Sequence, residues 1–280
     1  MTPPARTVLI TGCSTGIGRC CADGLRARGW RVFATARRAA DVAALAADGH
    51  EALALDLDAS DSIAAAVATV LERTGGTLDA LFNNGAYGQA GAVEDLSRAA
   101  LRAQFESNLF GWVELTNHVL PVMRRQGHGR VVMNSSVLGL VALPWRGAYT
   151  ATKFALEGLT DTLRLELAGS GVWVALVEPG PIESRFRANA LAAFERWIDA
   201  AGSVHRADYA RLRRRLERRG APAPFTLPPA AVLARVVHAL ESRRPRRRYP
   251  VTVPTRLFAL LRRLLPAALL DPLLARAGNG

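Results

Sequence analysis

The most specific chemical signal in this sequence is a tyrosine followed four residues later by the only lysine of the chain. Of the 36 basic residues, 35 are arginines, and Lys153 is the exception. On a helix, a four-residue separation places Tyr149 and Lys153 on one face. A phenol titrates near pH ~10, and a nearby cation lowers its pKa. The pair therefore predicts a tyrosine that exchanges protons near neutral pH. A lysine left by chance on a helix surface is the alternative.

A glycine-rich run predicts a site for a dinucleotide. Residues 11–18 lie between an apolar segment typical of a strand and a segment with helical spacing. Gly12 permits a tight turn, while Gly16 and Gly18 lack the Cβ that would hold a pyrophosphate away from the free amides of the helix. Because a strand precedes the loop and a helix follows it, dinucleotide binding is favoured over a plain turn.

The residues after the second predicted strand indicate which dinucleotide binds. An acid at this position binds the ribose hydroxyls of NAD, whereas an arginine binds the 2′-phosphate of NADP. The sequence has Arg37 and Arg38, and the next acid is Asp41. NADP is therefore predicted, with a solvated pair of arginines as the alternative. Asp56, which ends the third predicted strand, either accepts a hydrogen bond from the adenine or belongs to a turn.

Six short apolar runs predict strands, and they alternate with segments of helical spacing. Strands are expected at 8–11, 32–36, 52–57, 78–83, 131–134 and 172–177, and helices at 17–28, 60–73, 99–124 and 149–167. This alternation predicts an α/β fold, a doubly wound parallel sheet covered on both faces. Such sheets bind ligands at the carboxyl ends of their strands.

Together these residues resemble the short-chain dehydrogenase/reductase family over most of the chain. The family glycine motif matches residues 11–18, and its Tyr-x-x-x-Lys pair falls on Tyr149 and Lys153. Its catalytic serine corresponds to Ser136 and its catalytic asparagine to Asn108. The resemblance implies a Rossmann-type domain, an NADP(H) cofactor, a carbonyl or alcohol substrate and a homo-oligomer.

The resemblance also implies a role for each residue. Hydride passes between the nicotinamide and a carbonyl carbon while Tyr149 donates its proton, and Lys153 keeps the phenolate accessible. Ser136 holds the carbonyl oxygen, and Asn108 holds a water that connects Lys153 to solvent. Without the resemblance, Ser136 is equally a strand-end cap and Asn108 a polar residue inside a helix.

The expected cofactor contacts extend along the chain, and one of them departs from the family. They are Gly12, Ser14, Thr15, Gly16, Ile17, Gly18, Arg37, Asp56, Leu57, Asn83, Tyr149, Lys153, Pro179, Gly180, Ile182 and Ser184. Ser184 takes the place of the usual threonine near the nicotinamide carboxamide. The family run Asn-Asn-Ala-Gly is here Asn-Asn-Gly-Ala at 83–86. If the last position has a positive φ, Ala86 costs about 1 kcal/mol or the turn shifts by one residue.

The alternation of strand and helix ends after Glu178. Residues 185–225 predict a helical lid within a single Rossmann-fold domain that covers residues 1–254. Apolar residues favour a hydrophobic aldehyde or ketone as substrate, with ordinary core as the alternative. They are Leu138, Leu140, Val141, Leu143, Trp145, Phe186, Leu191, Phe194 and Trp197. Within the family, the runs 178–182 and 248–252 resemble 17β-hydroxysteroid and retinol dehydrogenases, and especially bacterial NADP-dependent aldehyde reductases.

The formal net charge of +12 comes from the last third of the chain. Residues 1–184 hold 16 basic and 18 acidic side chains, and residues 185–280 hold 20 and 6. The tail, 255–280, alternates leucines with arginines, and this basic amphipathic pattern fits peripheral contact with an anionic membrane. Pro266 and Pro272 are expected to break it into short pieces. Packing of the tail on its own domain or on a twin subunit is the alternative.

Several other function classes are disfavoured. The cysteines at 13, 20 and 21 have no disulfide or zinc spacing, so we expect no metal site and a reducing cytoplasm. No run approaches the ~18 apolar residues of a membrane span, and the run 8–10 is too short for a signal-peptide core. The arginine clusters lack interleaved aromatics, which argues against nucleic-acid binding. A dinucleotide-binding regulator without catalysis is the second hypothesis, and the intact catalytic set argues against it.

Overall fold

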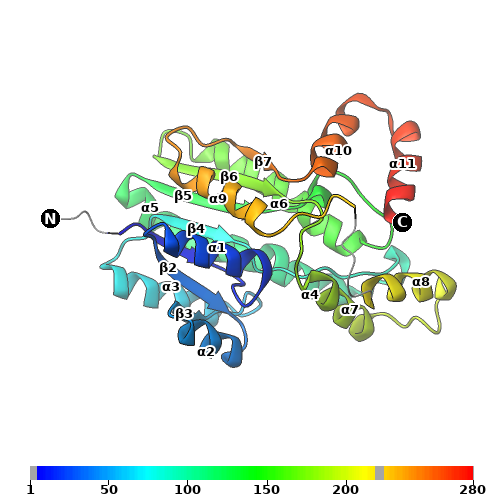
Figure 1. Cartoon of the computed structure of the whole chain (residues 1–280), viewed down its shortest axis with the longest axis horizontal. Helices are drawn as coiled ribbons and strands as arrows, with labels where there is room; N and C mark the ends of the chain where they lie inside the picture. The colour runs from blue at the N-terminus through cyan, green and yellow to red at the C-terminus, as the bar shows by residue number, and fades with distance from the viewer. Residues whose placement is uncertain (1–4, 218–223, 280) are drawn as a thin grey trace.

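The computed structural model describes residues 5–217 and 224–279 and contains a seven-stranded sheet with helices on both faces (Figure 1). The strand order is β3-β2-β1-β4-β5-β6-β7, and all neighbours are parallel. The strands are β1 (Thr7–Ile10), β2 (Arg31–Ala36), β3 (Glu51–Ala54), β4 (Ala80–Asn83), β5 (Gly129–Asn134), β6 (Val172–Glu178) and β7 (Arg248–Pro250). The order reverses beside β1, so the carboxyl ends of β1 and β4 border the crevice where such sheets bind ligands. The predicted Rossmann-type fold is confirmed.

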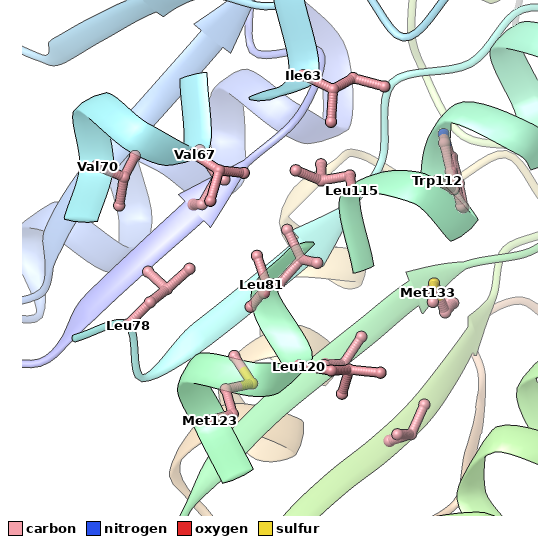
Figure 2. Packing of buried hydrophobic residues seen from close by; sticks show 14 of the residues in the cluster. Ile63, Val67, Val70, Leu78, Leu81, Trp112, Leu115, Leu120, Met123 and Met133 are labelled. Atoms are coloured by element: carbon pink, nitrogen blue, oxygen red, sulfur yellow. The ribbon is translucent and has the colours of Figure 1, made fainter. Parts of the chain in front are cut away.

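Two apolar layers cover the sheet because successive strand residues face opposite sides. Val8 and Ile10 of β1 pack with α1 (Gly16–Ala27), α2 (Ala39–Ala47) and α9 (Ala230–Glu241). Leu9, between them, packs with α3 (Ser60–Thr74), α5 (Gly111–Gln126) and α6 (Gly147–Glu166). Figure 2 shows this second layer, in which Leu115 and Trp112 of α5 lie over the sheet.

The segment predicted as a helix at 99–124 is helical throughout, but its hydrogen-bonding pattern changes in the middle. The chain forms α4 (Arg98–Phe105), a π-helical turn η2 (Glu106–Phe110) and then α5. A Cβ at Gly111 would lie 2.1 Å from the backbone oxygen of Leu57, so only glycine allows this approach of α5 to the loop after β3. A π-helical turn inserts one residue into a helix and is frequent at functional sites. Here it contains Asn108.

The predicted lid segment and the predicted tail are both helical. Helices α7 (Phe186–Trp197) and α8 (Arg206–Glu217) form the predicted lid segment, whose residues 218–223 lie outside the described part of the chain. The tail folds into α10 (Val253–Leu264) and α11 (Ala267–Asn279), which project from one end of the molecule (Figure 1). Pro266 separates them as predicted, whereas Pro272 lies inside α11, where the packing of Leu270 and Leu274 on Val141 maintains the helix. None of the described helices is long and apolar enough to span a bilayer.

Candidate active site

Helix α6 and the loop after β5 bring the predicted catalytic groups together. Tyr149 and Lys153 are buried, with 8% and 1% of their surfaces exposed. The Tyr149 hydroxyl shares a hydrogen bond with the hydroxyl of Ser136. The ammonium of Lys153 donates a hydrogen bond of 2.8 Å to the backbone oxygen of Asn134, the last residue of β5. The one-turn spacing on α6 therefore places the phenol and the ammonium beside the end of the same strand.

Asn108 holds the backbone next to this group. Its Nδ2 donates to the Tyr87 carbonyl at 2.8 Å, and its Oδ1 accepts from the Tyr87 amide at 3.2 Å. Its Nδ2 also lies 3.5 Å from Oγ1 of Thr152, between Tyr149 and Lys153 on α6. The π-helical turn thus directs a fully buried amide towards α6. Its predicted contact with a water remains a prediction.

Burial dominates the titration of the two central residues. The sequence predicted a lowered phenol pKa, but burial raises the pKa of Tyr149 to about 12, and the hydrogen bond with Ser136 opposes only part of this rise. Burial also lowers the pKa of Lys153 to about 7, with the charge of Glu157 acting in the opposite direction. The prediction of a lowered phenol pKa is therefore wrong for the described chain, because spacing alone does not reveal desolvation.

The ammonium of Lys153 lies near two aromatic rings, the predicted Tyr149 and Trp112, which the sequence did not predict. Its nitrogen is 4.2 Å from the centre of the Trp112 ring and 5.6 Å from that of the Tyr149 ring. Aromatic faces attract cations, especially where water is absent. The indole nitrogen of Trp112 donates to the Gly85 carbonyl at 2.8 Å, which fixes the ring under the ammonium. No sequence pattern connects Trp112 with Lys153.

One turn beyond Lys153, buried and partly buried charges form a group that we call the balanced cluster. The Arg248 guanidinium donates to Glu178 at 2.7 Å, to Asp161 at 2.6 Å and also to Glu157. Burial and the charge of Glu157 raise the pKa of Glu178 to about 7. With all groups ionised, three positive charges face three negative ones. The members are Lys153, Arg164, Arg248, Glu157, Asp161 and Glu178.

The glycine loop fits a pyrophosphate. Gly12 and Gly16 have φ angles of +70° and +61°, a region that favours glycine. A Cβ at Gly18 would lie 2.2 Å from the Gly12 carbonyl oxygen. Thr15 precedes α1 without capping it through its side chain, so amides of the first helical turn remain available for phosphate. The predicted contacts Ser14 and Ile17 lie in the same loop and first turn.

The segment after β6 faces this loop. Ser184 lies so close to Gly16 that a Cβ on the glycine would be 3.1 Å from the Ser184 Cβ. The carbonyl of Pro179 accepts a hydrogen bond of 2.7 Å from the amide of Val137, next to Ser136. The structure therefore brings three predicted regions to one edge of the sheet. The predicted contacts in this segment are Pro179, Gly180, Ile182 and Ser184.

Asn83 and Asn84, at the end of β4, differ from the prediction in what their side chains contact. The side chain of Asn83 is fully buried and donates to Oγ1 of Thr116 at 3.0 Å, so only its backbone is placed to meet a dinucleotide. Asn84, which was not predicted, donates to the Thr11 carbonyl at 2.9 Å and accepts from Asn134 at 2.9 Å. It thereby ties the glycine loop to β5.

The exchange of Gly85 and Ala86 causes no backbone strain. Ala86 is not among the described residues with positive φ, so the condition for the predicted cost is not met. Gly85 meets Gly12 instead, because a Cβ on Gly12 would lie 2.6 Å from the Gly85 Cα. The side chain of Leu57, a predicted cofactor contact, packs beside Gly85.

The residues expected around the adenosine differ in whether they already form ion pairs or hydrogen bonds within the protein. Arg38 forms an ion pair with Asp41 at 2.7 Å, whereas Arg37 is exposed and has no ion pair within the described residues. Asp56 accepts a hydrogen bond of 3.1 Å from the amide of Asp58, as its turn alternative predicts. Its second oxygen has no such bond in the described part of the chain.

Of the apolar residues predicted for a pocket, Phe186 of the lid reaches the site. Its ring lies 5.3 Å from that of Tyr149 in an edge-to-face arrangement. Phe194 packs in the lid against Tyr209, and Val141 packs against the tail, so these two belong to core as in the alternative interpretation. Within the described residues, no group of three or more His, Cys, Asp or Glu is placed to hold a metal ion.

Comparison with known proteins decides the family. The family model for short chain dehydrogenases matches residues 6–193. The chain belongs to the short-chain dehydrogenase family. This short-chain dehydrogenase is 41% identical over 269 residues to the uncharacterized oxidoreductase YbbO of Escherichia coli, covering 96% of this chain and 94% of that protein. It is 38% identical over 202 residues to human retinol dehydrogenase 8, covering 69% of this chain and 64% of that protein.

Solved structures are similar along most of this short-chain dehydrogenase. A variant of the actinorhodin polyketide ketoreductase with NADPH has a TM-score of 0.72 at 29% identity, with 88% of this chain and 95% of that one covered. A Burkholderia phymatum short-chain dehydrogenase in complex with NAD has a TM-score of 0.77 at 25% identity, with 95% of each chain covered. The family resemblance is thus confirmed, and the protein is an oxidoreductase of a family that uses nicotinamide dinucleotides.

Proposed function

We propose that the protein interconverts a hydrophobic aldehyde or ketone and its alcohol with NADP(H), using Tyr149 as the general acid and base. The observation that supports this most is the buried Tyr149 hydroxyl, bonded to Ser136 and backed by the ammonium of Lys153. A regulator that only binds a dinucleotide would not need this arrangement. If no carbonyl in a panel of aldehydes and ketones supported oxidation of NADPH, the result would favour a regulator that binds the dinucleotide without catalysis.

Each residue has a defined task in this proposal. A bound nicotinamide supplies or accepts hydride at the carbonyl carbon. Tyr149, whose pKa is about 12, is protonated at neutral pH and donates its proton to the developing alkoxide. Ser136 holds the substrate oxygen by a hydrogen bond. Lys153, whose pKa is about 7, stabilises the phenolate while protonated and passes a proton back through water held at Asn108.

Substitution of the phenol tests the proposal. Tyr149→Phe keeps the ring and removes the proton, so kcat should fall by about 10²–10⁴-fold. Binding of NADPH, followed by its fluorescence, should remain unchanged and serves as the control for folding. Retained turnover in the variant would refute the assignment of the acid.

Preference for NADP rests on Arg37. This side chain is exposed at the end of β2 without an ion-pair partner in the described chain, whereas Arg38 is engaged by Asp41. A charged hydrogen bond contributes about 1.5–3 kcal/mol, so Arg37→Ala should raise KM for NADPH at least about tenfold. The KM for NADH and the matched variant Arg38→Ala should change much less. A lower KM of the native protein for NADH than for NADPH would contradict the proposed preference for NADP.

The hydrophobic substrate class rests on Phe186 against Tyr149 and on the kinds of relatives. The names of two relatives refer to retinol and to a 17-beta-hydroxysteroid, both lipophilic alcohols. We expect retinoid-like, fatty or steroid-like carbonyls to be reduced with NADPH. Reduction of small polar ketones alone would contradict this class.

A second copy of the chain is the proposed partner on α5 and α6. Phe110 and Leu159 border a surface hollow there, and about half of each side chain is exposed. Apolar side chains that surround a hollow favour association. Leu159→Arg should lower the molar mass in light scattering, while Leu165→Arg, an exposed residue on the same helix, should not. An unchanged mass in Leu159→Arg would contradict this interface.

An anionic membrane surface is the proposed partner of the tail, with the protein otherwise cytoplasmic. The tail packs on its own domain through one face, and the leucines of the other face are exposed beside Arg256 and Arg263. Flotation with anionic vesicles should be lost in Leu257→Ser/Leu260→Ser/Leu264→Ser and kept in the control Leu165→Ser. Equal flotation of the two variants would contradict binding of the tail to an anionic membrane. The exposed leucines are Leu257, Leu260, Leu264, Leu269 and Leu273.

A further inference from the structure

Arg146 and Arg215 meet where α8, the tail and the start of α6 come together, and Arg187 of α7 is close enough for its charge to act on both. We call these three residues the arginine triad. Arg146 directly precedes α6 and donates a hydrogen bond of 3.1 Å to the Pro144 carbonyl. Arg215 of α8 donates to the Gly278 carbonyl of α11. Gly278 packs directly on Pro144, since a Cβ there would lie 2.5 Å from the proline ring. Arg146 and Arg215 therefore approach the same contact from two sides.

The arginine triad has no counter-charge in the described part of the chain. Burial lowers the pKa of Arg146 to about 10, and repulsion by Arg215 and Arg187 adds to this. The pKa of Arg215 is lowered by burial and by Arg187. Elsewhere on α8 the pattern is ordinary, since Arg213 pairs with Glu195 at 2.6 Å. The three side chains are partly buried, and like charges held together away from bulk water repel one another, so the arrangement favours an anionic ligand.

The arginine triad adjoins the substrate side of the site. Arg146 lies three residues before Tyr149, about 4.5 Å along the axis of α6. Arg187 directly follows Phe186, whose ring contacts that of Tyr149 at 5.3 Å. The lid segment that covers the tyrosine thus also contributes a cation.

We propose that the arginine triad binds an anionic group, a carboxylate or a phosphate, at the end of the substrate remote from the reacting carbonyl. Guanidinium groups bind such oxygens through paired hydrogen bonds. The inference rests on the proposed reductase function and narrows its substrate class to lipophilic carbonyls with an anionic end. The apolar surface of Phe186 then lies along the chain between the two ends.

Kinetics with a matched pair of aldehydes test the inference. The rates at which the holoenzyme reduces two aldehydes with NADPH are compared: a medium-chain n-alkanal and the ω-carboxylate aldehyde of the same chain length. Arg187→Gln and Arg215→Gln should each lower kcat/KM for the carboxylate about tenfold, since a charged hydrogen bond is lost, and leave kcat/KM for the alkanal unchanged. Arg214→Gln, an exposed neighbour on α8, is the control that should change neither value. A series of ω-carboxylate aldehydes should show an optimal length that the alkanals lack.

A second measurement requires no turnover. With the nucleotide site saturated by NADP⁺, inorganic phosphate should raise the Tm of the native protein more than that of Arg187→Gln/Arg215→Gln. Equal shifts in the two proteins would overturn the inference, because the phosphate would then bind elsewhere.

The outcomes separate this inference from the function on which it rests. If the alkanal is reduced but the variants treat both aldehydes alike, the arginine triad does not bind substrate and the reductase function stands. If neither aldehyde nor any other carbonyl is reduced, the proposed function fails, whatever the phosphate result. If Arg215→Gln lowers flotation with anionic vesicles and leaves the ratio of the two kcat/KM values unchanged, the ligand is a lipid headgroup, and the substrate assignment is overturned.

Discussion

Two groups of partly buried charges include residues of the α6 segment on either side of Tyr149, and they are built in opposite ways. In the balanced cluster, Arg248 bonds three carboxylates and Lys153 adds a further positive charge. In the arginine triad, positive charges meet without an acid among the described residues. The charges of the balanced cluster therefore offset one another within the chain, while the ammonium of Lys153 is held by the Asn134 carbonyl and the Trp112 ring. The arginine triad has charges of one sign, and in our proposal an anionic ligand neutralises them when it binds.

The energetic reason for this contrast is desolvation. Removing a charge from water costs several kcal/mol, and within a protein a close partner is what offsets that cost. Loss of one member should therefore have opposite consequences in the two groups. The balanced cluster should lose stability, whereas the arginine triad should lose affinity for a ligand.

The largest effect is expected from Arg248→Met. This change leaves Glu157 and Glu178 buried without their shared cation, and the free energy of unfolding should fall by about 3–5 kcal/mol in urea titrations. The neighbouring Arg247 is exposed, and Arg247→Met should change it by less than about 0.5 kcal/mol. A loss no larger than that of the control would show that the balanced cluster does not need its central cation.

An intermediate effect is expected in the pH dependence of carbonyl reduction. The reaction needs Lys153 protonated, so kcat should fall as the pH rises through about 7, the pKa of this lysine. The charge of Glu157 raises that pKa, and Glu157→Gln should therefore move the midpoint to lower pH. The groups that face Lys153 are Tyr149 and Glu157 of α6, Trp112 of α5 and the carbonyl of Asn134.

The control for this profile is Glu166→Gln, at the exposed end of the same helix. It should leave the midpoint in place. A midpoint that moves to higher pH in Glu157→Gln would contradict the electrostatic role of Glu157.

The smallest effect is expected from Arg215→Gln in buffer without multivalent anions. The variant loses one hydrogen bond to Gly278 and also one source of repulsion, so the free energy of unfolding should change by less than about 0.5 kcal/mol. Thermal unfolding in neutral buffer measures this. A loss above about 2 kcal/mol would mean that Arg215 has a partner within the fold, and the contrast between the two groups would disappear.

Much of the fold and of the site was predicted from short-range patterns in the sequence. The strand, loop and helix around Gly12 and the one-turn spacing of Tyr149 and Lys153 are short-range features, and they identified the fold class and the residues that meet at the site. The π-helical turn at Asn108 was missed, because no local pattern of residue types marks this change of hydrogen bonding within a helix. The sequence left open whether Ala86 is strained, and the structure decides against strain because the close approach to the glycine loop falls on Gly85.

By itself the sequence determined the alternation of strand and helix, the family and the chemistry available on α6, because these depend on residue types at fixed local spacing. Only the tertiary structure decided how these groups titrate and which charges meet. Trp112, Glu178 and Arg248 are far in sequence from Lys153, and Arg187 and Arg215 are far from Arg146. Desolvation and charge pairing depend on distances across the folded chain, and no local pattern contains those distances.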